Sequence, residues 1–216
     1  MSDLPIFLSY SEDEEGTRAA THLRDALTLM HVDAVMARSA IAPGADWEQT
    51  IRGHLESSEA LICVGTPGFT SRPWCQQEVG WALGRRIPIM WIQYTRDELP
   101  AGFLARTQAL DAVDKESSEV ARALLEWLAR ASGTRDAVAE TLVSALEGSE
   151  SFKDARDAAG LLALVGPVDT SVWSRVEAAA EANNQVGNAV VWVEGAYRKK
   201  VSVLEWLQRR IGPAAP

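Results

Sequence analysis

Apolar and polar residues alternate in blocks over the first 130 positions, in a way that predicts strands separated by helices. Short apolar runs at Ile6–Tyr10, 32–37, 60–64 and 87–92 predict four strands, and a weaker run at 107–112 predicts a fifth. Apolar strands that alternate with helices are typical of a parallel sheet covered on both faces. We therefore predict a doubly wound α/β domain, in which ligands bind beyond the carboxyl ends of the strands.

Between these runs, apolar residues recur at intervals of three or four, as on one face of a helix. Ser11 with Glu14 three residues later has the spacing of a capping box, so we expect Ser11 to begin the first helix. Pro73 suits the first turn of a helix and predicts where a later one begins. Helices are predicted at 14–30, 47–55, 73–84 and 117–130.

The last third of the chain has a helical pattern throughout. A helix over 134–147 precedes a polar stretch over 148–151, which we interpret as a linker. Three further helices are predicted over 152–165, 170–183 and 196–211. We therefore expect three parts, which are an α/β domain over 1–132, a helix and linker over 133–150, and a small all-α bundle over 151–216.

Composition and charge exclude several classes of protein. Of the 216 residues 47% are apolar, enough for a core, and no apolar run is long enough to span a membrane. The net charge of −9 disfavours binding to nucleic acid. Cys63 and Cys75, without histidines at ligand spacing, predict neither a disulfide framework nor a metal site. The first residues lack the pattern of a secretion signal, so we expect a cytoplasmic protein.

The segment from Phe69 to Glu78 carries the candidate chemistry, because it follows the third strand at the carboxyl edge of the predicted sheet. Trp74 and Glu78 are four residues apart and share a helix face, and Trp81 lies three residues further along it. A carboxylate between two indoles is partly desolvated, so we expect a raised pKa for Glu78. Such a group suits contact with a sugar, beside an aromatic plane on which a ring can stack.

These segments resemble the TIR-domain family. The resemblance rests on Ile6–Tyr10, on residues 41–44 before Trp47, and on the run from Thr66 to Glu78, in the right order over residues 4–130. It implies the flavodoxin-like fold of that family, a doubly wound five-stranded parallel sheet in the order 2-1-3-4-5, followed here by the small all-α module.

The resemblance also implies an activity, because many TIR domains, bacterial ones above all, cleave NAD⁺ between nicotinamide and ribose. It makes Glu78 the catalytic carboxylate, which would stabilise an oxocarbenium-like ribose. The products would be nicotinamide and either ADP-ribose or a cyclic isomer. NAD⁺ is then a substrate, and no resident cofactor is expected. The start of the first helix would attract the diphosphate. Substrate contacts are implied for Ser9, Tyr10, Arg38, Trp47, Ser71 and Trp74.

Two other functions stay open at this point. One is a catalytically silent TIR scaffold that signals by self-association, and the other is a nucleoside deoxyribosyltransferase with a related sheet and glutamate. The resemblance implies homo-oligomers through TIR–TIR contacts, in bacterial immune or stress signalling such as antiviral defence. The C-terminal module resembles the helical adaptor modules of bacterial effectors, so we expect it to bind a protein partner.

Overall fold

A parallel five-stranded sheet forms the centre of the N-terminal part of the chain. The computed structural model describes residues 4–36, 47–193 and 199–213. The strands lie in the order β2-β1-β3-β4-β5 and every neighbouring pair is parallel. The predicted fold class and strand order are therefore confirmed. The strands are β1 (Ile6–Tyr10), β2 (Ala34–Val35), β3 (Ala60–Gly65), β4 (Ile89–Gln93) and β5 (Leu110–Asp111).

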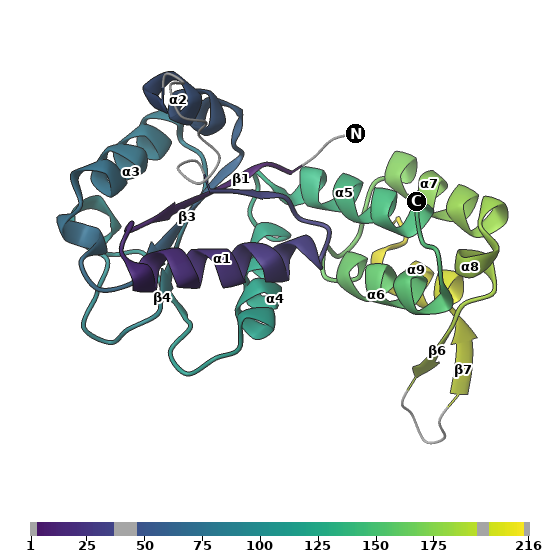
Figure 1. The fold of residues 1–216 in the computed structure, drawn as a ribbon. Coiled ribbons are helices and arrows are strands. Elements are labelled where there is room, and N and C mark those ends of the chain that lie inside the picture. Colours follow the sequence, from purple (N-terminus) through teal and green to yellow (C-terminus); the bar gives the residue numbers. More distant parts are fainter. Residues whose placement is uncertain (1–3, 37–46, 194–198, 214–216) are drawn as a thin grey trace. The chain divides into compact units, whose positions relative to one another are not determined.

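Helices cover both faces of this sheet (Figure 1). Helix α1 (Glu14–Thr28) lies on one face, and α2 (Trp47–Ser57) and α3 (Pro73–Arg85) lie on the other; α4 (Ser117–Leu128) follows β5. Successive side chains of a strand point to opposite faces. Phe7 belongs to the core beneath α2 and α3, so Ser9 faces the same helices and Tyr10 faces away from them. This core contains Phe7, Ile51, Leu55, Leu61, Cys63, Phe69, Cys75, Val79, Ala82, Trp91 and Leu104.

A tryptophan at the middle of β4 dominates the packing beneath these helices. Trp91 is only 1% exposed and meets Phe69 edge to face, with 5.0 Å between the ring centroids. Gly65, at the end of β3, leaves room for the indole, because a Cβ there would lie 2.6–2.7 Å from its ring atoms. The contact between Phe69 and Trp91 therefore anchors the beginning of the loop that leads from β3 to α3.

The start of α1 differs from the sequence prediction. Asp13, rather than Ser11, caps this helix, and its carboxylate accepts the N–H of Gly16 at 2.8 Å. That hydrogen bond lowers the pKa of Asp13. Ser11 is buried, and its Oγ lies 3.1 Å from Thr66 Oγ1 in the loop after β3. A carboxylate is a stronger acceptor than a hydroxyl and Asp13 directly precedes the first helical residue, so Asp13 takes the cap.

Residues from Arg135 onward, together with Leu128–Arg130, form a second compact unit, separate from the residues up to Trp127 with Ala131–Thr134. Helix α5 packs against α6 and α7, so it belongs to this unit, whereas the sequence analysis assigned 133–150 to a connecting helix and linker. The elements of the unit are α5 (Arg135–Glu147), α6 (Phe152–Leu162), α7 (Thr170–Ala182), α8 (Asn184–Gly187), β6 (Val190–Val193), β7 (Lys199–Ser202) and α9 (Val203–Ile211).

The prediction that this module is all-α is wrong, because β6 and β7 form an antiparallel hairpin where the helix over 196–211 was expected to begin. Val190–Val193 is a β-branched and aromatic run, which suits a pleated strand better than a helix. The last helix begins only after Ser202, whose Oγ accepts the N–H of Glu205 at 3.1 Å. The spacing of Ser202 and Glu205 is itself a helix-start signal that the sequence analysis did not use.

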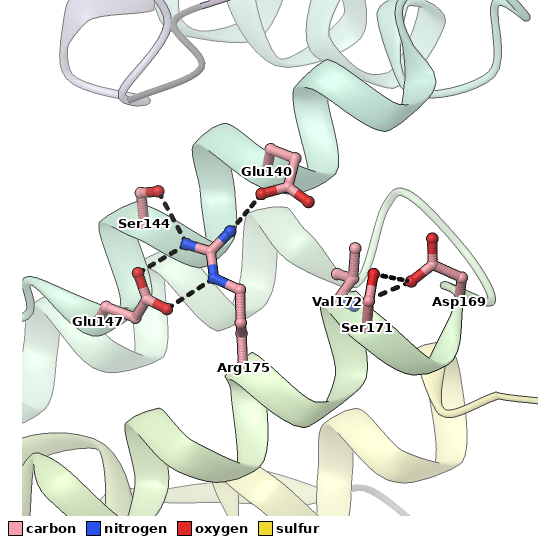
Figure 2. Close-up of polar contacts among 7 residues, drawn as sticks. All are labelled: Glu140, Ser144, Glu147, Asp169, Ser171, Val172 and Arg175. Carbon is pink, nitrogen blue, oxygen red and sulfur yellow. Dashed lines mark hydrogen bonds and ion pairs between the residues drawn. The ribbon is translucent and has the colours of Figure 1, made fainter.

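Figure 2 shows a polar cluster that joins α7 to α5. Arg175 donates hydrogen bonds to both carboxylate oxygens of Glu147, at 2.7 and 2.9 Å, to Ser144 Oγ at 3.1 Å, and to Glu140. The hydrogen bonds from Arg175 to Glu147 are the main reason that the pKa of Arg175 is raised. Asp169 caps the start of the same helix. These contacts fix how α7 lies against α5 within the C-terminal unit.

Candidate active site

Helix α3 carries the candidate carboxylate, and its two ends are fixed by different contacts. Arg72 is extended and Pro73 occupies the first turn, where the missing N–H of proline costs no hydrogen bond. Near the other end, Arg85 donates to the carbonyl oxygens of Leu55 at 2.7 Å and Ser58 at 3.2 Å, at the end of α2. The last turns of α2 and α3 are therefore tied together.

The loop before α3 is held by a carboxylate that the sequence analysis did not single out. Glu98, which follows β4, accepts the N–H of Gly68 at 2.9 Å, the N–H of Thr70 at 2.7 Å and the hydroxyl of Thr70 at 2.6 Å. Burial alone would raise the pKa of Glu98, but these hydrogen bonds together outweigh burial and lower it. Gly68 has a φ of 85°, in the left-handed region that favours glycine. Glu98 thus fixes the turn that leads into α3.

Glu78 faces the interior of the molecule. Its side chain is 5% exposed, and Ser9, at the end of β1, is 1% exposed. Ser9 Oγ donates to Glu78 Oε2 at 2.5 Å, across 69 positions of sequence. Since β1 is an inner strand, paired with both β2 and β3, a rigid element orients this carboxylate.

Two buried thiols lie close to Glu78. Cys63 is the β3 partner of Ser9, and burial raises the pKa of its thiol well above the usual value, with further increases from the charge of Glu78 and from Cys75. Cys75 Sγ donates to the carbonyl oxygen of Tyr10 at 3.4 Å. The thiolate is the nucleophilic form of cysteine, so the neutral Cys63 is a packing residue and not a nucleophile.

Glu78 lines a small pocket between α2 and α3. The other lining residues are Ile51, Arg52 and Leu55 of α2 and Trp74, Gln77 and Trp81 of α3. The volume of the pocket is about 100 Å³. Pockets that enclose a whole drug-sized ligand measure roughly 300–1,000 Å³. The pocket formed by these residues therefore has room for one end of a dinucleotide, and the rest would lie outside it.

Polar groups at this pocket complement its apolar walls. The guanidinium carbon of Arg52 lies 5.8 Å from the centroid of the Trp81 ring, within cation–π range. Trp81 Nε1 is buried and has no hydrogen-bond partner among the described residues. The site thus combines the positive charge of Arg52 with the Glu78 carboxylate. A ligand with anionic groups and hydrogen-bond acceptors fits this combination.

Three of the seven predicted site residues come together in the structure. Glu78 and Trp74 line the pocket, and Ser9 contacts Glu78. Tyr10 follows Ser9 and faces away from α3, because side chains alternate along a strand. Ser71 Oγ donates to the carbonyl oxygen of Gly68 at 2.9 Å, so this hydroxyl belongs to the turn. Neither Tyr10 nor Ser71 is among the lining residues.

The start of α1 is a poorer anion site than the sequence analysis expects. Asp13 already accepts the N–H of Gly16, and Arg72 lies 3.5 Å from Asp13 in an ion pair. Glu14 and Glu15 add two exposed carboxylates in the first turn of the helix. Negative side chains repel a diphosphate, so the phosphate contact expected here gains no support from the geometry.

Two predicted residues cannot be compared, since Arg38 and the side chain of Trp47 lie outside the described residues. Their substrate contacts stay predictions. Conversely, the sequence analysis missed Arg52, Gln77 and Glu98. Arg52 and Gln77 are direct neighbours of residues that it did use, so helix geometry contained a signal for them. Glu98 had no local signal, because its partners lie 28 and 30 positions away.

Among residues 4–36, 47–193 and 199–213, no three histidine, cysteine, aspartate or glutamate side chains gather so that they could hold a metal ion. In the same part of the chain, no helix has the length and apolar character needed to cross a membrane.

The strand order and the buried glutamate after the third strand define the N-terminal unit as a flavodoxin-like α/β domain with a candidate carboxylate site. The family model of the TIR domain matches residues 6–125, more than half of the chain, so the chain belongs to the TIR domain family. TIR domains typically self-associate or bind other TIR proteins.

Among solved structures, the chain is similar to the TIR domain of the Toll-related receptor TRR-2 from Hydra magnipapillata. The similarity has a TM-score of 0.42 and 23% sequence identity, over 49% of this chain and 82% of the other. A comparison with curated proteins gives no match.

Proposed function

We propose that this TIR domain cleaves the bond between nicotinamide and ribose in NAD⁺, with Glu78 as the catalytic carboxylate. The observation that carries the proposal is a buried glutamate that lines a pocket beside Trp74 and Trp81. On the open surface, water would screen a carboxylate, and its effect on a neighbouring reaction would be small. In a buried position beside Trp74 and Trp81, the same charge acts at close range in a setting of lower dielectric constant.

The chemistry follows from where charge develops during cleavage. When the glycosidic bond breaks, its electron pair stays on the ring nitrogen of nicotinamide, which leaves as a neutral ring. Positive charge builds up at C1′ and the ring oxygen of the ribose, as in glycoside hydrolysis. The Glu78 carboxylate stabilises this charge more strongly in the transition state than in the ground state. Water then bonds to C1′ and loses a proton to give ADP-ribose, or an adenine nitrogen takes its place and gives a cyclic isomer.

Ser9 is a positioning residue in this proposal. Its hydroxyl holds Oε2 of Glu78 at 2.5 Å and so fixes the orientation of the carboxylate. Removal of the hydroxyl leaves the charge in place but lets the carboxylate turn. We therefore expect Ser9→Ala to lower kcat while KM changes little.

The small size of the pocket suggests why assembly of protomers would be needed for activity. With about 100 Å³, it can receive the nicotinamide end, while the diphosphate and adenosine lie over its rim near Arg52. In the proposal, a second protomer in a TIR–TIR assembly covers these exposed parts of the substrate. NAD⁺ is consumed as a substrate, and the protein acts as an effector in bacterial immune or stress signalling that assembly switches on.

Nicotinamide release from NAD⁺, followed at increasing protein concentration, tests the proposal. We expect release by the wild type and by Glu56→Gln, which makes the same chemical change at an exposed glutamate of α2. Glu78→Gln should lose at least about 100-fold in rate, the scale on which a single stabilising group acts. Circular dichroism verifies that each variant is folded. Equal rates for Glu78→Gln and wild type would refute the assignment.

The small pocket favours a second candidate, the catalytically silent scaffold, because a scaffold needs no room for a dinucleotide. A wild type that releases no nicotinamide at any concentration, but forms oligomers as concentration rises, supports this function. Release of a base from deoxynucleosides, without release from NAD⁺, supports the deoxyribosyltransferase instead. The same samples serve all three measurements.

A further inference from the structure

The C-terminal unit has an open hollow beside its hairpin, which we call the hairpin surface. Its lining includes Arg156 of α6, Val190 and Trp192 of β6, Lys200 of β7 and Trp206 of α9. The volume is about 600 Å³, within the range of ligand-binding pockets. Figure 1 shows the hairpin projecting from the helices of this unit. The sequence predicts that this unit binds a protein partner, but it predicts neither the surface that binds nor the chemical character of the bound segment.

The register of the hairpin decides which side chains face outward. Val191 is paired with Val201, which is buried, so this pair faces the helices. Trp192 is paired with Lys200 and lies on the opposite face, because neighbours in a strand alternate. Trp192 is 55% exposed. A large aromatic side chain is therefore presented to the outside next to a lysine.

Two tryptophans on this surface are each accompanied by a cation. Lys200 Nζ lies 5.0 Å from the ring centroid of Trp192, and the guanidinium carbon of Arg210 lies 4.3 Å from that of Trp206. Tryptophan and arginine are enriched at binding interfaces and at the residues that dominate their energy. The surface therefore offers apolar planes and positive charges close together.

The charge of this surface is opposite to that of the chain. The net charge of the whole protein is −9, yet Arg156 and Lys200 line the hollow and Arg210 stacks on one of its tryptophans. Within the described part of α6 and α9, Asp157 and Glu205 form ion pairs with Lys153 and Arg209, and not with these three cations. A surface of this kind attracts an acidic partner and orients it during encounter.

The strands add main-chain groups to the side chains. Among the described residues, β6 and β7 pair only with each other, so each strand has an edge without a strand neighbour. An extended peptide can bind to such an edge through backbone hydrogen bonds. We propose that the hairpin surface binds an extended acidic segment of a partner protein. Carboxylates of the segment lie against Arg156, Lys200 and Arg210, beside the indoles of Trp192 and Trp206.

A single-stranded nucleic acid would also use tryptophans and cations. Two observations favour the peptide. The open strand edges match a peptide backbone, which nucleic acid lacks, and the net charge of −9 repels a polyanion from the molecule as a whole. A short acidic segment needs only the local positive field.

Fluorescence anisotropy of the full chain with a labelled peptide tests this proposal. The probe has about ten residues of alternating glutamate and valine, so that in a strand the carboxylates share one face. A peptide with lysine in place of glutamate and a thymidine oligonucleotide of equal length are the comparison ligands. We expect the acidic peptide to bind at least about tenfold more tightly than either, and more weakly as salt rises.

Two charge-reversal variants distinguish the effect of the hairpin surface on peptide binding from the effect of the net charge of the protein. Lys200→Glu should weaken binding of the acidic peptide at least tenfold, while Arg106→Glu, the same type of change at an exposed residue of the N-terminal unit, should leave it within about twofold. Arg210→Gln is the second test should Lys200→Glu fail to fold. Equal affinity for the acidic and basic peptides, tighter binding of the oligonucleotide, or equal effects of Lys200→Glu and Arg106→Glu would each overturn the proposal.

Discussion

Replacement of Glu98 by glutamine tests how the loop before α3 is held in place. In the native protein, its two carboxylate oxygens accept three hydrogen bonds, from the N–H groups of Gly68 and Thr70 and from the hydroxyl of Thr70. A hydrogen bond to a charged group contributes about 1.5–3 kcal/mol. Glutamine keeps one neutral acceptor and turns an NH₂ group toward one of the two amides. We therefore expect the loop to open about 2–3 kcal/mol more easily.

Amide hydrogen exchange measures this opening directly. Since each 1.4 kcal/mol corresponds to a factor of ten, the amides of Gly68 and Thr70 should exchange roughly 30- to 150-fold faster in Glu98→Gln. Asp97→Asn, the same change at the neighbouring exposed carboxylate, is the matched control and should leave both amides as in the wild type. Wild-type exchange at both amides in Glu98→Gln would show that the carboxylate does not hold the loop.

The pH dependence of the same measurement follows from the pKa of Glu98. The folded protein lowers this pKa, so the stabilisation is fully present above the pKa of the unfolded chain. It is lost as the pH falls through the lowered pKa of the folded state. The difference in loop protection between wild type and Glu98→Gln should therefore be largest at neutral pH and shrink toward acidic pH. A difference that grows on acidification would contradict the assignment.

Two further changes test the packing and capping of the N-terminal unit. Gly65→Ala puts a methyl group about 2.6 Å from the Trp91 ring, so urea unfolding should show a loss of about 1–3 kcal/mol. Gly53→Ala on α2, where a Cβ meets nothing within 4 Å, should cost nothing. Asp13→Ala should cost about 1 kcal/mol at neutral pH. Because the native pKa of Asp13 is lowered, this cost should fade as the pH falls through it, and a cost independent of pH would argue against the cap.

The sequence predicted best what depends on local pattern. The strands β1, β3 and β4 are short apolar runs that follow from local composition and spacing, whereas their order in the sheet was implied by the resemblance to TIR domains. Glu78 and Trp74 were found in the same way, since four positions along a helix bring them to one face. The residues Ser9 and Glu78 were both singled out, but the hydrogen bond that joins them could not be, because 69 positions separate them.

The features that could not be predicted are of two kinds. In some, two neighbouring residues could fill the same structural role, and in others the deciding contact is with a residue distant in sequence. Ser11 and Asp13 are both acceptable caps, and Asp13 takes the cap because its carboxylate directly precedes the helix, while the Ser11 hydroxyl lies against Thr66. The sequence of residues 199–202 is compatible with a helix, yet these residues form a strand because they pair with β6. Helix α5 looked like a connection because Arg175, which ties it to α7, lies 28 and 35 positions away from Glu147 and Glu140.

Both cysteines of the chain lie in the N-terminal unit, and Cys63 and Cys75 are buried and free of disulfides. A maleimide added to the native protein therefore reacts only with molecules in which this unit has opened. The C-terminal unit has no cysteine, so opening of that unit produces no labelling. The rate of labelling, followed by mass spectrometry, therefore measures how often the unit that contains Glu78 opens, and no reporter group has to be introduced.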